Sequence, residues 1–156
     1  IIVYPDTYHV PSSKNNEGIV VQRLESRAGE SWYRGPVVLS WSNVDSNLND
    51  AHNVVIHEFA HKLDEENQMM DGLPILRQGD HYQAWAETLG QEYSEFLGRV
   101  EKNSNKVIDS YGAVSAVEFF AVISEAFFEK PELMKRKLPE LYAQLSRYYG
   151  VDVAEW

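Results

Sequence analysis

Residues 54–64 read VVIHEFAHKLD and contain the pattern H-E-x-x-H within an apolar stretch. Successive residues of an α-helix are about 100° apart, so His57 and His61 point within about 40° of each other. Two imidazoles in this arrangement can both reach one zinc ion at roughly 2.0–2.1 Å. Glu58 borders the same point without having to be a ligand, so it can accept a proton from a water that zinc has acidified. The stretch predicts a zinc-dependent hydrolase with Glu58 as its base.

The alternative interpretation is a chance match. In a chain of this length and ordinary composition, the pattern would arise by accident with a probability on the order of one per cent. The match also lies within a predicted amphipathic helix, which the chemistry requires. The remaining histidines, His9, His52 and His81, lie outside this spacing, and we expect them to be surface or core residues.

Other residues of the predicted helix fit the same orientation. Val55, Phe59 and Leu63 fall on the face opposite the histidines, so we expect them to anchor the helix in the core. Asp64 follows His61 by nearly one turn and could orient the second ring nitrogen of a ligand. Asp64 could equally be a solvated charge near the end of the helix.

Strand-like segments come first in the chain, and helical patterns follow. Three segments rich in Val and Ile are predicted strands, separated by polar loops around residues 11–18 and 29–35: Ile1–Tyr4, Ile19–Arg23 and Val37–Trp41. We expect Val37–Trp41 to be an edge strand beside the active-site cleft, where an extended peptide could pair. This order predicts an α+β fold with residues 1–156 as a single domain.

The helical part is divided by loops and prolines. A first helix is predicted to start near Asp45–Asn49 and to run to about Asn67, before a loop from Asn67 to Asp80. Further helices are predicted over residues 81–101 and 116–129, with a final region that starts at Pro131, is kinked by Pro139 and ends at Gly150.

Composition excludes several functions. The chain has 24 Asp and Glu against 14 Lys and Arg, a net charge of −10, so we expect no nucleic acid as a partner. Its apolar runs are far shorter than the ~20 residues of a membrane span.

With no cysteine, a third zinc ligand must be a carboxylate or another histidine. The metzincin pattern would need His at position 67 and Gly at position 64, where Asn67 and Asp64 stand.

A second apolar helix supplies two candidate carboxylates. Residues 115–131 read SAVEFFAVISEAFFEKP, in which Glu118 and Glu125 are seven apart and share a helix face. An acidic residue among so many Phe and Ile side chains needs a partner. Ser115 and Glu118 also fit a capping box, which would use the carboxylate on backbone N–H groups. The pattern alone leaves the order of Glu118 and Glu125 open.

Three blocks in order resemble the Mlc titration factor A family of zinc metallopeptidases: VVIHEFAHKLD, the D-x-Y segment at Asp109–Tyr111, and AVEFFAVISEAFFEKPEL at 116–133. The strand PVVLSW at 36–41 is also similar. The resemblance implies a zincin-like fold in which Zn²⁺ is held by His57, His61 and Glu118. The resemblance also implies that Glu125 contacts a metal ligand and does not bind the metal itself. Family members are longer, so it also implies that this chain is the core of a longer protein.

The same family is similar to the catalytic domain of anthrax lethal factor, a gluzincin with H-E-F-x-H-x-x-D. There a Tyr seven residues before the ligand Glu stabilises the reacting oxyanion, and Tyr111 stands at that offset from Glu118. The alternative is a packing tyrosine, since the chain has nine. Val122 departs from the thermolysin-like pattern, which has an Asp four residues after the ligand.

The resemblance further implies a cytoplasmic bacterial enzyme that hydrolyses peptide substrates with aminopeptidase-type activity. The G-x-M-E-N signature of the large aminopeptidase family is absent, so this activity rests on the resemblance alone. The family takes its name from binding the repressor Mlc. Sequestration of that repressor is therefore the alternative function, alone or beside catalysis.

Overall fold

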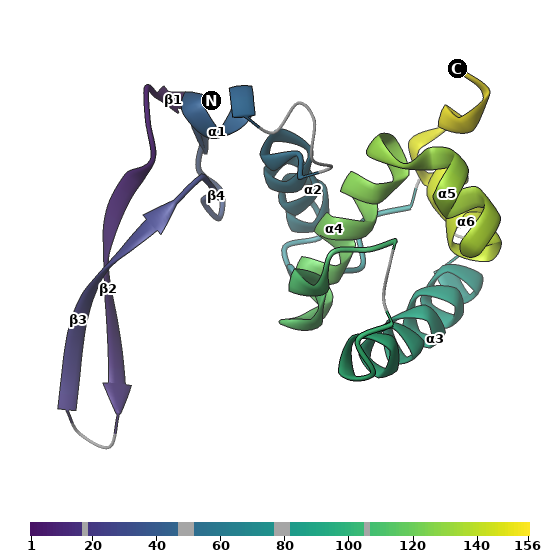
Figure 1. The fold of residues 1–156 in the computed structure, drawn as a ribbon, viewed down its shortest axis with the longest axis horizontal. Coiled ribbons are helices and arrows are strands. Elements are labelled where there is room, and N and C mark those ends of the chain that lie inside the picture. The colour runs from purple at the N-terminus through teal and green to yellow at the C-terminus, as the bar shows by residue number, and fades with distance from the viewer. Residues whose placement is uncertain (17–18, 47–51, 77–81, 105–106) are drawn as a thin grey trace.

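Strands precede helices along the chain, as the sequence predicts for an α+β protein. A computed structural model describes residues 1–16, 19–46, 52–76, 82–104 and 107–156. In Figure 1 the strands lie at one end of the molecule, and the helices from α2 onward make up the other end. The α+β prediction is confirmed.

A three-stranded sheet has the order β1-β5-β4, formed by Ile2–Tyr4, Val37–Ser40 and Gly29–Ser31. β1 runs parallel to β5, and β4 runs antiparallel to it. Every residue of β5 is buried, and the strand has a neighbour on each side. The prediction that residues 37–41 form an edge strand is therefore wrong. β4 occupies that edge, and Trp41 already begins helix α1 (Trp41–Ser46).

β2 (Tyr8–Asn16) and β3 (Ile19–Arg27) form an antiparallel hairpin in which Tyr8 pairs with Arg27. The hairpin projects away from the helices (Figure 1). The predicted strand at Ile19–Arg23 is confirmed, whereas the predicted loop over residues 11–16 is wrong. Backbone pairing with the Val-rich partner strand outweighs the weak strand propensity of these polar residues.

The helices follow in chain order: α2 (Val54–Glu65), α3 (Tyr82–Glu101), the 3₁₀ turn η3 (Ser110–Ala113), α4 (Ala116–Glu129), α5 (Pro131–Lys137), α6 (Pro139–Tyr149) and η4 (Val153–Glu155). The bounds predicted for α4 and the end at Gly150 are confirmed; Gly150 caps α6 with a φ of 71°. Pro139 starts a new helix and does not kink one. His81, the predicted start of α3, lies outside the described residues. Within the described ranges, no helix is long and apolar enough to cross a membrane.

Helix α2 begins at Val54 and not near residues 45–49. Asp45 belongs to α1, and residues 47–51 lie outside the described part of the chain. The side-chain oxygen of Asn53 accepts the backbone N–H of Ile56 at 3.2 Å, so Asn53 is the N-cap. An Asn directly before an apolar run was the correct sequence signal.

The hydrophobic core is centred on α4. All its residues from Phe119 to Phe127 are buried, and α3 and α6 pack around it with Trp85, Phe96 and Leu141. α2 contacts α4 on one side and β4 on the other, which places its histidines between the core and the small sheet. Phe59 is 40% exposed, so its predicted role as a core anchor is wrong.

Candidate metal centre

Two histidines of α2 and one glutamate of α4 meet at a point. The ring centroids of His57 and His61 are 4.8 Å apart, and the ring planes are nearly perpendicular, at 86°. Oε2 of Glu118 lies 3.1 Å from Nε2 of His57 and 3.5 Å from Nε2 of His61. The structure thus brings together the three residues that the sequence suggested as ligands, although α2 and α4 are far apart in the chain.

The start of α4 explains where the Glu118 carboxylate points. Ser115 Oγ accepts the backbone N–H of Glu118 at 3.2 Å, which forms the first half of a capping box. The Glu118 carboxylate faces the two histidines. Among the described residues Ser115 therefore caps the helix by itself, and the Glu118 side chain is free to act at the site.

The arrangement of His57, His61 and Glu118 fits a metal ion. One ligand atom from each residue lies within 4.8 Å of the other two, and two imidazoles with one carboxylate are a common donor set for transition metals. Burial would raise the pKa of Glu118, but hydrogen bonds with the two histidines outweigh it and lower the pKa to about 2. Glu118 is therefore an anion at neutral pH, as a ligand must be.

The electrostatic field at this point favours positive charge. Burial would lower the pKa of His57, but hydrogen bonds with Glu118 and Glu125 outweigh burial and raise it to about 10. The same two carboxylates that favour a proton on His57 would favour a metal cation. The charge at the site and the positions of the three side chains therefore both favour a bound metal cation.

Glu125 contacts His57 from behind. Its Oε1 lies 2.7 Å from Nδ1 of His57, the ring nitrogen opposite the one that faces Glu118. Its Oε2 accepts the backbone N–H of Asn53 at 2.8 Å. A carboxylate in this position fixes the tautomer and the orientation of a histidine ligand. The geometry thus gives Glu118 and Glu125 different positions, which the sequence pattern alone could not do.

Asp64 is fully buried one turn after His61. Its Oδ2 accepts the backbone N–H of Gly72 at 2.9 Å, so it ties the loop after α2 back to the helix. Its Oδ1 and Nδ1 of His61 are both buried, and neither has a hydrogen-bond partner among the described residues. Asp64 is thus not a solvated surface charge, and a contact with His61 stays a prediction.

Glu58 lines the same cleft and is 7% exposed. Burial raises its pKa, although His57 and His61 act in the opposite direction. Strand β4 passes close by: a Cβ added to Gly29 would lie 2.8 Å from Oε1 of Glu58 and 2.7 Å from Cγ2 of Val54. Gly29 therefore allows the edge strand to approach α2 at the carboxylate itself.

Tyr111 approaches from the 3₁₀ turn η3. Its ring centroid lies 6.0 Å from that of His57, and the residue is 50% exposed on the cleft. The side chain of Asp109 accepts the backbone N–H of Tyr111 at 2.6 Å and so caps the turn. Gly112 packs against α4, where a Cβ would lie 2.6 Å from Cγ2 of Val122. Tyr111 is thus held at the cleft and does not pack in the core.

The cleft has a cavity volume of about 920 Å³, which is within the usual range for ligand sites. Besides the predicted residues, it is lined by β4 and by His52. The sequence does not predict either as part of the site, because a three-residue strand gives no periodicity and His52 has no ligand spacing. His9 hydrogen-bonds Ser26 at 3.1 Å on the exposed hairpin, as expected for a surface histidine.

Comparison with known proteins supports a metal-dependent function. The profile of the family described as glucose-regulated metallo-peptidase M90 matches residues 1–150. The chain belongs to this family. Membership and the group formed by His57, His61 and Glu118 together indicate a metal cofactor.

Individual relatives match along almost the whole chain. An uncharacterised protein of Synechocystis sp. is 42% identical over 97% of this chain and 57% of its own length. Mlc titration factor A of Edwardsiella ictaluri is 34% identical, and that of Serratia proteamaculans is 32% identical, each over 97% of this chain and 60% of the relative. The chain thus spans about 60% of the length of the curated relatives that it matches.

Proposed function

We propose that this chain is the catalytic region of a zinc-dependent peptidase. The observation that carries the proposal is the convergence of Nε2 of His57, Nε2 of His61 and Oε2 of Glu118, with Glu58 beside them in one cleft. We propose zinc as the metal because a catalytic zinc site uses three protein ligands, often two histidines and a glutamate.

Each residue at the site has a chemical task. When bound, zinc polarises the carbonyl of the substrate and lowers the pKa of a water molecule. Glu58 accepts the proton of the attacking water and passes it to the leaving amine. Tyr111 donates a hydrogen bond to the oxyanion that develops on the substrate. Glu125 keeps His57 in the tautomer that presents Nε2 to the metal.

A peptide substrate can be held by strand β4. Among the described strands β4 has a partner only on the β5 side, and its residues Gly29–Ser31 line the cleft. A peptide pairing with the other edge of β4 would pass directly over Glu58. The edge-strand role proposed for residues 37–41 thus belongs to β4. By resemblance we propose aminopeptidase-type activity.

The proposal is tested by separating metal binding from chemistry. The wild-type protein, purified without chelator, should contain about one zinc per chain. His57→Ala and Glu118→Ala should lose it, because each removes one ligand. Glu58→Gln should keep zinc but lose most hydrolysis of short peptides, since the amide cannot accept a proton.

Glu129→Gln is the matched control for these variants, because Glu129 is exposed on the same helix as Glu118 and, within the described part of the chain, hydrogen-bonds only the Asn53 side chain. It should retain both zinc and activity. Full zinc content in Glu118→Ala together with wild-type rates in Glu58→Gln would refute the proposed site.

A second candidate function is binding of the repressor Mlc. It is favoured by the name of several relatives, Mlc titration factor A. A repressor partner would place the protein in the bacterial cytoplasm. Binding should survive Glu58→Gln, which changes proton transfer and not the shape of the surface. Tight repressor binding by a zinc-loaded protein that cleaves no member of a broad peptide library would make this the better function.

A further inference from the structure

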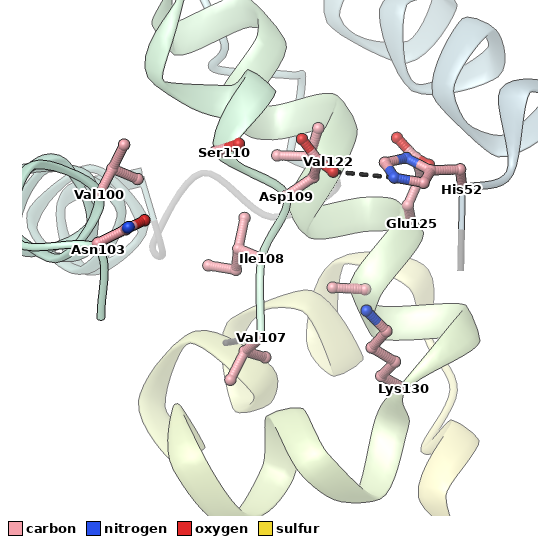
Figure 2. A pocket seen from close by; sticks show the side chains of 11 residues that line it. His52, Val100, Asn103, Val107, Ile108, Asp109, Ser110, Val122, Glu125 and Lys130 are labelled. Carbon is pink, nitrogen blue, oxygen red and sulfur yellow. Dashed lines mark ion pairs between the residues drawn. The ribbon is translucent and has the colours of Figure 1, made fainter. Parts of the chain in front are cut away.

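A second pocket adjoins the candidate metal cleft behind an ion pair. Nε2 of His52 lies 3.0 Å from Oδ2 of Asp109 (Figure 2). Both residues border both cavities. Glu125 also borders both and contacts the back of the His57 ring at 2.7 Å. The imidazole ring of His57 and the Glu125 carboxylate behind it thus lie between the second pocket and the candidate metal site.

The pocket has the size and lining of a side-chain subsite. Its cavity volume is about 290 Å³, just below the range of about 300–1,000 Å³ that is typical of sites for whole ligands. Aliphatic residues from three parts of the chain form its walls, including Val100, Val107 and Val122. Polar groups are contributed by Asn103, Ser110 and Lys130. Such a lining suits an aliphatic stem with a polar end.

Among the described residues, the charged groups around the pocket include one that has no ion-pair partner. The Asp109 carboxylate is paired with His52, and the Glu125 carboxylate is used by His57 and Asn53. Lys130 is partly buried, and no described carboxylate lies within ion-pair distance of its ammonium group. In Figure 2 the Lys130 side chain points from the end of α4 toward the middle of the pocket.

A partly buried ammonium group without a counter-ion is unfavourable, and an anionic ligand would relieve this. We propose that this pocket binds an acidic side chain of the substrate, next to the peptide bond that is cleaved. The methylene stem packs on the aliphatic walls, and the carboxylate pairs with Lys130. The proposal rests on the peptidase function, for which it names a substrate class. A free C-terminal carboxylate has the same chemistry, so the test must distinguish the two.

The test uses peptide pairs that differ only in Glu or Gln at each position flanking the cleaved bond. The zinc-loaded wild-type protein should cleave one Glu peptide about 10- to 100-fold faster, in kcat/KM, than its Gln partner. Lys130→Met should abolish that preference, so that the Glu and Gln peptides are cleaved at the same rate. Lys137→Met, which removes an exposed lysine of α5, should leave the preference intact. Each pair is made with a free and an amidated C-terminus, and a preference that follows only the free terminus assigns the pocket to it and overturns the side-chain proposal.

Two further variants keep the test decisive if Lys130→Met folds poorly. Lys130→Arg should retain the preference for Glu, and Lys130→Glu should shift it toward Lys at the same position. Binding of the same peptides to zinc-loaded Glu58→Gln, measured by calorimetry, separates this proposal from the peptidase function. Tighter binding of the Glu peptide that depends on Lys130 supports the pocket even if nothing is cleaved. Efficient cleavage with equal rates for Glu and Gln peptides overturns the pocket and leaves the peptidase function standing.

Discussion

Oε1 of Glu125 lies 2.7 Å from Nδ1 of His57, across 68 positions of sequence. The other oxygen of the same carboxylate accepts the N–H of Asn53, the residue that caps α2. One side chain of α4 therefore holds both the start of the helix that carries the histidines and the ring of its first histidine. This contact makes the metal site depend on the packing of α2 against α4.

The contact predicts a role for Glu125 in metal affinity. Glu125→Gln keeps the shape but weakens the hydrogen bond to Nδ1 of His57, and loss of such a partner typically lowers metal affinity about 10- to 100-fold. Competition with a chromogenic chelator measures the change. Glu129→Gln, which alters only an exposed contact with Asn53, is the control. Equal affinities for the two variants would mean that Glu125 serves only the fold.

Gly29 is predicted to control the position of Glu58. In Gly29→Ala the new methyl group would meet Oε1 of Glu58 and Cγ2 of Val54 at less than 3 Å. We expect peptide hydrolysis to fall strongly while zinc content is retained, because no ligand is touched. Gly90→Ala is the control, since a Cβ there has open space and Ala favours a helix by up to about 1 kcal/mol. Unchanged kcat in Gly29→Ala would show that β4 simply moves aside.

Glu58 should reduce stability at neutral pH. Burial raises its pKa above the ordinary value of 4.5, so the folded state binds the proton more tightly than the unfolded state. The protonated form of Glu58 therefore stabilises the folded state relative to the ionised form. This stabilisation is complete below pH 4.5 and is lost as the pH rises through the pKa of Glu58 in the folded state. In metal-free protein, Glu58→Gln should therefore raise Tm at pH 7, and the difference should vanish below about pH 4.5. A constant Tm difference across this range would contradict the assignment of the raised pKa to Glu58.

Tyr111→Phe tests the oxyanion donor. Tyr111 is half exposed, and no hydrogen bond of its hydroxyl to a described residue is present, so folding and zinc content should be unchanged. Loss of one oxyanion donor typically reduces kcat about 10²- to 10³-fold. Single-turnover kinetics on a short peptide measures this. A wild-type rate would leave Tyr111 with no part in the chemistry.

Local features were readable from the sequence where one helix carries the whole signal. The four-residue spacing of His57 and His61 needs only helical geometry to place both rings on one face. The bounds of α4 followed from Ser115 and from the largely apolar run that ends before Pro131. The Asn53 cap was missed because several other good caps stand a few residues earlier.

Tertiary structure decided what depends on contacts between distant segments. Glu118 and Glu125 share a helix face, and only the packing of α2 on α4 sets one at Nε2 and the other at Nδ1 of His57. Similarly, β5 has the composition of any buried strand, so its central place depended on β1 and β4 pairing with it on both sides. Helical spacing is a property of consecutive residues, whereas strand order and the choice between two carboxylates arise from the burial of apolar faces that are distant in sequence.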